Sequence, residues 1–165
     1  MDFSSVEALI ALRSVRSFRP DAVPDDLVRS ILEVGRHTPS AHNIQPWHFI
    51  VVSDPDVKQR LARGRARFIE DAAFAIVGCG DVTASSKGHA REVAMAMQSM
   101  VLAAWLLGIG SCWVEVNADD SELRVLLNLP ASLKAVALVV FGYPAEIPKP
   151  VWKKPLDEIV HYNRF

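Results

Sequence analysis

The segment from Glu92 to Leu107 is apolar almost all round. It contains neither Pro nor Gly and is rich in Ala, Met and Leu, which predicts a helix that is buried on most sides. The longest apolar run, from Met100 to Gly110, is shorter than the ~20 residues that a bilayer requires, so it does not predict a membrane span. The helix therefore lies either at the centre of the fold or partly in an interface between subunits.

The length and composition predict one folded domain over residues 1–165. Hydrophobic residues make up 50% of the chain and charged residues 22%, as in globular proteins. The formal net charge of -1 provides no positive field for nucleic acid. Asp2 and Glu7 stand where an export signal would be basic, and Cys79 and Cys112 lack the spacing of a zinc ribbon or a disulfide framework. We therefore expect a cytoplasmic protein with neither nucleic acid nor a membrane as a partner.

Helix caps, prolines and β-rich runs predict alternating helices and strands. Helices are expected at 4–12, from Pro24 to before Pro39, from Pro55 onward, at 92–107 and at about 119–127, and strands at 48–52, 73–79, 111–116 and 135–141. Strands separated by helices indicate an α+β or α/β sheet protein. The helix that begins at Pro55 carries basic residues that are expected to face solvent: Lys58, Arg60, Arg63, Arg65 and Arg67. After the last strand, a Pro-rich stretch predicts an extended C-terminal arm over about 144–165.

Most catalytic constellations are missing from the sequence. Gly108 and Gly110 follow a predicted helix rather than a strand, and they lack the third glycine of a dinucleotide fingerprint. There is no P-loop and no nucleophile elbow. The five histidines show no paired-ligand spacing, so no metal is assigned. Cys112 lies in an apolar strand, which favours an inert packed thiol over a nucleophile.

Three segments carry more polar chemistry than folding alone requires. LRSVRSF, at 12–18, places two arginines and a serine just after a predicted helix, and guanidinium groups suit phosphates and electron-rich carbonyls. TPSAHNIQPWHFIVV, at 38–52, places small polar residues between two prolines before a strand, which predicts a rigid loop able to approach a planar ligand. The arm carries Lys149, Lys153 and Lys154, which either close over an anion or keep the arm soluble.

Together these segments resemble the nitroreductase family of flavin-dependent oxidoreductases over nearly the whole chain. The Arg-x-Ser-x-Arg/Lys element of the family is matched at Ser14 and Arg16, and its Pro-Ser-x-x-Asn-x-Gln-Pro-Trp loop at 39–47. Its Leu-Gly-x-Gly-x-Cys-Trp element is matched at 107–113, and its closing Gly-Tyr-Pro and Lys-Pro-Leu at 142–144 and 154–156. The resemblance implies a three-layer α+β fold with a mostly antiparallel central sheet flanked by helices, in a domain-swapped homodimer that holds FMN at the subunit interface.

The resemblance also implies a role for particular residues. The FMN phosphate or ribityl chain would be contacted by Arg13, Ser14 and Lys153. Arg16 would face the N1/O2 edge of the ring, where it carries the electrostatic part of catalysis. Against the ring would lie Pro39, Ser40 and Asn43 of the partner subunit. Backbone N–H groups near N5 and O4 would come from Val114, Glu115 and Val116. For each arginine, an ordinary surface charge near a helix end is the alternative.

The sequence departs from the family pattern at a few positions. Leu12 stands where many members have Arg, Val116 where relatives often have Gly, and Lys153 where Arg is common. The Asn that touches the flavin from the third helix in some members has no counterpart, although Arg65 or Arg67 lies in that neighbourhood. The chain is also shorter than many members, which predicts a reduced lid over the pocket.

The function implied by the resemblance is transfer of hydride from NADH or NADPH, through N5 of FMN, to small acceptors such as nitroaromatics or quinones. The cofactor carries that chemistry, which fits the absence of a catalytic triad or a carboxylate pair. Two alternatives remain open at this point. One is a family member of another purpose, such as dehalogenation or flavin breakdown. The other is a degenerate, non-catalytic flavin-binding protein.

Overall fold

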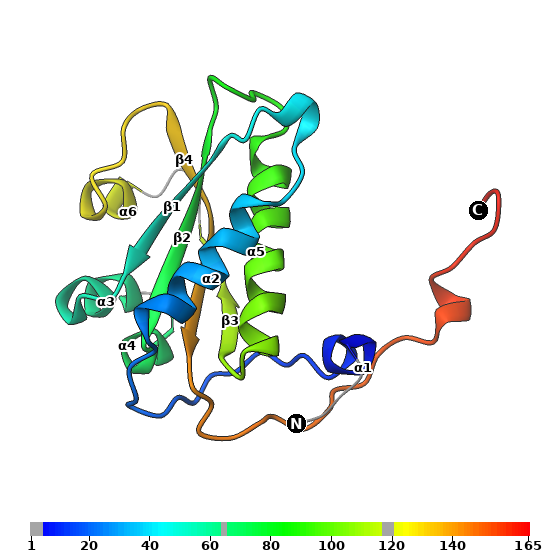
Figure 1. Cartoon of the computed structure of the whole chain (residues 1–165). Helices are drawn as coiled ribbons and strands as arrows, with labels where there is room; N and C mark the ends of the chain where they lie inside the picture. Colours follow the sequence, from blue (N-terminus) through cyan, green and yellow to red (C-terminus); the bar gives the residue numbers. More distant parts are fainter. Residues whose placement is uncertain (1–4, 64–65, 117–120) are drawn as a thin grey trace.

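The computed structural model describes residues 5–63, 66–116 and 121–165. Within these ranges, four antiparallel strands form one sheet between two layers of helices (Figure 1). The strands lie in the order β1-β2-β4-β3 and comprise β1 (Trp47–Val52), β2 (Phe74–Asp81), β3 (Gly110–Val114) and β4 (Leu133–Gly142). The helices are α1 (Ser5–Ile10), α2 (Asp25–Arg36), α3 (Pro55–Ala62), α4 (Phe68–Asp71), α5 (His89–Leu106) and α6 (Ser121–Leu126), with short turns η1 (Ala41–Asn43) and η2 (Leu156–Glu158). The α+β architecture expected from the sequence is therefore confirmed.

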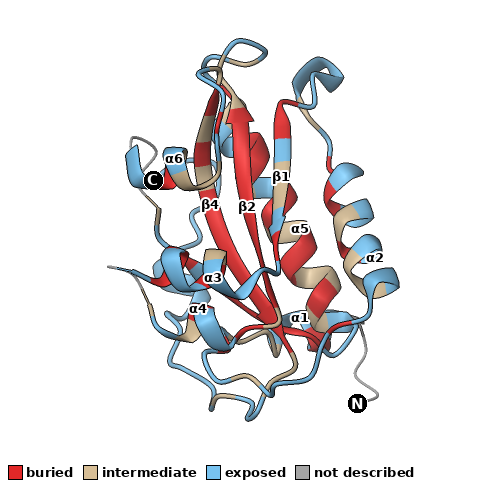
Figure 2. Cartoon of the chain, turned by 90° about the vertical axis from the view of Figure 1, so that its left-hand side faces the viewer, coloured by how far each residue is buried: buried red, intermediate tan, exposed pale blue. Residues whose placement is uncertain are grey.

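Side chains of successive strand residues point to opposite faces of the sheet. Both faces are buried, each in a core of its own. In β2, Phe74 and Ile76 belong to the core shared with α2 and α5, whereas Ala75, Val77 and Cys79 belong to the core shared with α3, α4 and α6. Figure 2 shows β2 and β4 as the most buried strands, between these two helical layers. Both cysteines are buried free thiols, and burial raises the pKa of Cys79 to about 11.

Two glycines allow α5 to approach its neighbours closely. A Cβ at Gly78 in β2 would lie 2.8 Å from Val93 Cγ1 and 2.9 Å from Met97 Cγ, closer than real Cβ atoms come. A Cβ at Gly35 in α2 would overlap the side chain of Met100. The centre of the molecule is therefore a tight contact between α5, β2 and α2, as the apolar character of α5 predicted.

One stripe of α5 stays uncovered within a single chain. Met95 and Leu106 are exposed, and Leu102 between them is half-buried. None of the helices in the described ranges is long and apolar enough to cross a membrane. The open stripe is the part of α5 that an interface between subunits would cover.

The C-terminal arm leaves the body of the molecule (Figure 1). Residues 151–165 are all exposed. The backbone amides of Glu158, Ile159 and Val160 donate hydrogen bonds to carbonyls of the arm itself, at Pro155 and Leu156. Residues 151–165 nevertheless carry seven large apolar side chains in the open: Val151, Trp152, Leu156, Ile159, Val160, Tyr162 and Phe165. The expected extended arm is present.

Two details of the sequence interpretation need correction. Pro24 is the N-cap residue of α2 rather than its first helical residue. Lys58 was expected on a solvated face, but it is buried: Nζ donates hydrogen bonds to the carbonyl oxygens of Glu70 (3.2 Å) and Ala72 (2.5 Å). The other described basic residues of that stretch, Arg60, Arg63 and Arg67, are exposed. Ser4, Arg65 and the expected helix start at 119–120 lie outside the described residues.

Replacing Lys58 with Met should destabilise the protein. Lys58 holds the carbonyl groups at the end of α4, and burial lowers the pKa of its ammonium group. Met fills similar space but leaves both carbonyls unpaired, at a cost of about 1–3 kcal/mol in the free energy of unfolding. Urea denaturation measures this loss, and Lys149→Met, at an exposed position on the arm, is the matched control. Equal stability of the two variants would contradict the capping role.

Candidate functional site

The arginine-rich segment predicted from the sequence lies beside edge strand β3. Ser14 forms a parallel bridge with Ser111, and the Val15 amide donates a hydrogen bond to the Ser111 carbonyl (2.8 Å). Val15 is fully buried, while Ser14 and Arg16 are exposed. Both lie near Cys112: burial raises the pKa of that thiol, and the Arg16 charge and a Ser14 hydrogen bond act in the opposite direction. The fold therefore brings Ser14 and Arg16 together on one side of β3.

Arg13 has a structural contact that the sequence did not predict. Its Nη1 group donates hydrogen bonds to the carbonyl oxygens of Ile10 (3.0 Å) and Leu12 (2.8 Å), which cap the end of α1. Its Nε atom is buried and has no hydrogen-bond partner among the described residues. Part of the Arg13 guanidinium is thus committed to the fold, and the rest keeps unused donor capacity.

The charge of this segment is not neutralised by neighbouring acids. Within the part of the chain that the structure describes, neither Arg13 nor Arg16 forms an ion pair. Arg19, three residues further on, contrasts with them, because it pairs with Asp21 (3.3 Å) and lies over the Tyr143 ring (5.2 Å). A pair of guanidinium groups without acidic partners is suited to binding an anion.

The end of β3 follows close to this segment. Val114 is the last residue of β3 and is buried, Glu115 is exposed and Val116 is half-buried against the core on the α3, α4 and α6 side. Residues 117–120 lie outside the described residues. The structure therefore places the three β3-end residues on the strand that carries the Ser14 bridge.

The loop between α2 and β1 is held on α5 at Glu92 and Ser99. The Thr38 hydroxyl donates to Ser99 Oγ (3.2 Å), and the Ala41 amide donates to Glu92 Oε1 (2.8 Å). The Gln45 amide donates to Ser40 Oγ (2.9 Å), which closes the loop on itself. Pro39 and Asn43 stay exposed, and Ser40 is half-buried.

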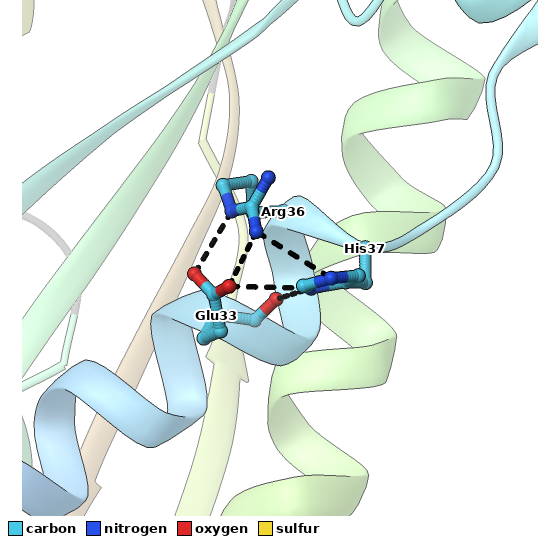
Figure 3. Close-up of polar contacts among 3 residues, drawn as sticks. All are labelled: Glu33, Arg36 and His37. Carbon is cyan, nitrogen blue, oxygen red and sulfur yellow. Dashed lines mark hydrogen bonds and ion pairs between the residues drawn. The ribbon is translucent and has the colours of Figure 1, made fainter.

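A cluster of charged residues ends α2 immediately before this loop (Figure 3). Arg36 donates from Nε to Glu33 Oε2 (2.8 Å) and from Nη2 to Glu33 Oε1, and His37 Nδ1 donates to the Glu33 carbonyl (2.9 Å). The hydrogen bond from Arg36 lowers the pKa of Glu33. All three side chains are exposed, so the cluster adds little stability and forms a helix end rather than a site.

In a single chain, the predicted site residues fall into separate groups. The loop at 38–46 leads into β1, whereas the segment at 13–16 lies beside β3, at the opposite edge of the sheet and about 14 Å away by strand spacing. Along α5, Ala41 of the loop contacts Glu92 and Ala8 of α1 contacts Trp105, about 20 Å apart by helical rise. Lys153 is exposed on the arm. One chain alone therefore places the segment at 13–16 beside β3, the strand that ends at Val114, and keeps the loop at the other edge of the sheet.

The chain matches the family model described as the nitroreductase family over residues 11–72 and 62–143. It is 32% identical over 192 residues to an NADH dehydrogenase of Thermus thermophilus, with 93% of each chain covered, and 30% identical to an iodotyrosine deiodinase of Thermotoga neapolitana, covering 93% of this chain and 94% of that one. The solved FMN-dependent nitroreductase of Clostridium difficile R20291 is similar with a TM-score of 0.86 and 26% identity, covering 97% and 99%.

The fold and these matches define the class of the protein. The chain belongs to the nitroreductase family, as its motifs predicted. The assignment as an oxidoreductase enzyme of this family and the layered α+β fold are confirmed.

Proposed function

We propose that this protein is an FMN-dependent oxidoreductase that takes hydride from NADH or NADPH and passes it to a small acceptor such as a nitroaromatic or a quinone. It works as a homodimer with two equivalent sites. The observation that carries the proposal is the separation of the predicted flavin contacts at opposite edges of one sheet. Two copies related by a two-fold axis would bring the loop of each copy to the arginine segment of the other.

The donor set at 13–16 fits the polar half of FMN. When bound, FMN supplies a carrier that accepts and releases hydride. Arg13 and Ser14, together with Lys153 brought in by the arm, hold the phosphate and the ribityl chain, and Arg16 faces the N1/O2 edge. The donors that this requires are Arg13 Nε, which has no hydrogen-bond partner among the described residues, and the Arg16 guanidinium, which forms no ion pair with them. Backbone groups at 114–116 face N5 and O4.

The second half of the pocket comes from the other copy. The ring is covered by Pro39, Ser40 and Asn43 of the partner subunit. In each chain these residues lie on a loop held by α5 and left open toward solvent, which is the arrangement expected of a surface that is completed by assembly. The uncovered stripe of α5 and the apolar residues of the arm supply the rest of the interface.

The names of the relatives support a particular co-substrate and cofactor, but they point to more than one kind of electron acceptor. A relative covering nearly the whole chain is named an NADH dehydrogenase, and a structure of the same fold is named an FMN-dependent nitroreductase, which supports NADH or NADPH with FMN. Another relative of similar length is named an iodotyrosine deiodinase, so reductive dehalogenation is the second candidate function. A panel of nitroaromatics, quinones and halogenated phenols, tested with FMN-loaded protein, separates the two.

The expected result for the purified protein is a yellow dimer that bleaches when NADH or NADPH is added without oxygen. Sedimentation at micromolar concentration measures the dimer, and mass spectrometry of the released cofactor identifies FMN. Because Leu12 provides no charged donor, partial loss of flavin during purification is expected, with recovery on adding FMN. FAD in the released fraction would overturn the cofactor assignment, and a protein that takes up FMN but does not bleach with NADH or NADPH would leave the non-catalytic alternative.

A further inference from the structure

Glu92 is a buried acid that the sequence interpretation and the proposed function leave unused. It lies in the first turn of α5 and is only 4% exposed. Oε1 accepts the hydrogen bond from the Ala41 amide at 2.8 Å, and Oε2 is buried with no hydrogen-bond partner in the described part of the chain. Burying a half-satisfied carboxylate opposes folding, so packing alone does not account for this residue.

The backbone that Glu92 holds is strained. His42, Asn43 and Gln45 have φ angles of 52°, 57° and 53°, in the left-handed region that favours glycine. Such conformations cost free energy and persist only where the surroundings impose them. They cluster in this loop, whose internal hydrogen bonds run from the Asn43 amide to the Ser40 carbonyl (3.0 Å), from the Ile44 amide to the Ala41 carbonyl (3.1 Å), from the Gln45 amide to Ser40 Oγ and from the Gln45 side-chain amide to the Asn43 carbonyl (3.1 Å).

The hydrogen bond from the Ala41 amide to Glu92 holds the loop immediately before its left-handed residues. Ala41 lies between Ser40 and the three left-handed residues, so its position sets where the strained turn begins. A hydrogen bond to a buried carboxylate is stronger than one to a neutral acceptor and is short-ranged and directional. Two further hydrogen bonds join the loop to the rest of the chain. Thr38 to Ser99 links two neutral hydroxyls at 3.2 Å before the turn, and the Asp81 amide donates to the Pro46 carbonyl (2.8 Å) after it.

We propose that Glu92 is a positioning residue: its carboxylate holds the strained loop at 40–45 in the conformation that covers the flavin. This inference rests on the proposed function, because the loop acts on the flavin site of the partner subunit. Glu92 itself touches neither cofactor nor substrate. Burying Oε2 without a hydrogen-bond partner in the described part of the chain lowers the stability of the fold, and this cost accompanies the placement of Glu92.

The test uses Glu92→Met, which removes the acceptor but fills similar space, and Glu92→Gln, which keeps an acceptor oxygen. Glu122→Ala, at an exposed acid of α6, is the matched control. Amide hydrogen exchange of residues 38–46 is measured on flavin-free dimer, and the FMN dissociation constant is measured by fluorescence quenching. Thermal unfolding is followed for every variant.

In Glu92→Met we expect exchange of the Ala41 amide to accelerate at least about tenfold and FMN binding to weaken by a similar factor, with no fall in melting temperature. Glu92→Gln should stay near the parent in both measurements. Unchanged exchange in Glu92→Met overturns the inference, as does faster exchange with unchanged FMN affinity. If Glu92→Met does not fold, Glu92→Ala is judged by the same criteria. A parent protein that binds no FMN overturns the proposed function instead. Because hydrogen exchange is measured on flavin-free protein, it tests the contact between Glu92 and the loop separately from FMN binding.

Discussion

A chain that ends at Pro150 should fold but fail to form a stable dimer. Residues 151–165 are fully outside the body of the chain, so their removal leaves the sheet and both helical layers intact. In the proposed dimer their seven large apolar side chains are buried on the other copy, and each is worth about 1.5–3 kcal/mol when fully buried. Even a third of that gain, lost from two arms, weakens association by several orders of magnitude.

Sedimentation and circular dichroism together measure this effect. The truncated chain should sediment as a monomer at 10 µM, where a dimer needs an association free energy of about 7 kcal/mol to persist. Its far-UV spectrum should be that of a folded protein. It should also lose FMN, because Lys153 is removed. Glu158→Gln, which changes the charge of the arm and keeps its apolar residues, should remain a dimer. A truncated chain that stays dimeric would show that the α5 stripe alone holds the interface and that the arm is not exchanged.

The secondary structure was predictable because local signals and packing agree. Pro24 before α2 and Pro55 as the first residue of α3 mark helix starts, and the apolar pattern of α5 matches a helix packed against β2 and α2. Lys58 was placed wrongly because a basic helix face is usually solvated, and no local pattern shows that the carbonyls of α4 need a donor. Contacts of this kind depend on segments that only the fold brings together.

The candidate site was predictable as a set of residues but not as a geometry. Its motifs locate Ser14 and Arg16, yet nothing in the sequence shows that Arg13 caps α1 with one nitrogen. Glu92 was missed because acidic residues are common in the first turn of a helix, where their charge interacts favourably with the helix dipole. Asn43 suits the left-handed region, but nothing in the sequence showed that Gln45 adopts it as well. Strain and burial are tertiary properties, so a single sequence does not display them.

Arg16→Ala should lower the reduction potential of the bound flavin by some tens of millivolts. Reduction places negative charge on the N1/O2 edge, and in the proposed site the unpaired guanidinium of Arg16 stabilises the reduced form more than the oxidised form. A hydrogen bond to a charged group contributes roughly 1.5–3 kcal/mol, and for a two-electron couple ~30 mV corresponds to about 1.4 kcal/mol. Reduction by NADH or NADPH should slow accordingly.

Two neighbouring arginines make this effect specific to Arg16. Arg13→Ala should mainly weaken FMN binding and leave the potential nearly unchanged, because Arg13 is assigned to the phosphate end. Since Arg13 also caps α1, its variant should in addition lose some thermal stability without flavin. Arg19→Ala should change neither property, because Arg19 is already paired with Asp21 and Tyr143.

The decisive measurement is a redox titration of each variant with FMN saturating, so that differences in affinity do not enter. A drop confined to Arg16→Ala places that guanidinium at the ring edge and gives it the electrostatic role. An Arg16→Ala potential equal to that of the parent would make Arg16 an ordinary surface charge beside β3. Equal drops in Arg16→Ala and Arg19→Ala would instead indicate a general effect of net charge. That effect should shrink as salt is raised, because exposed charges further apart than the Debye length, about 10 Å at 0.1 M, are largely screened.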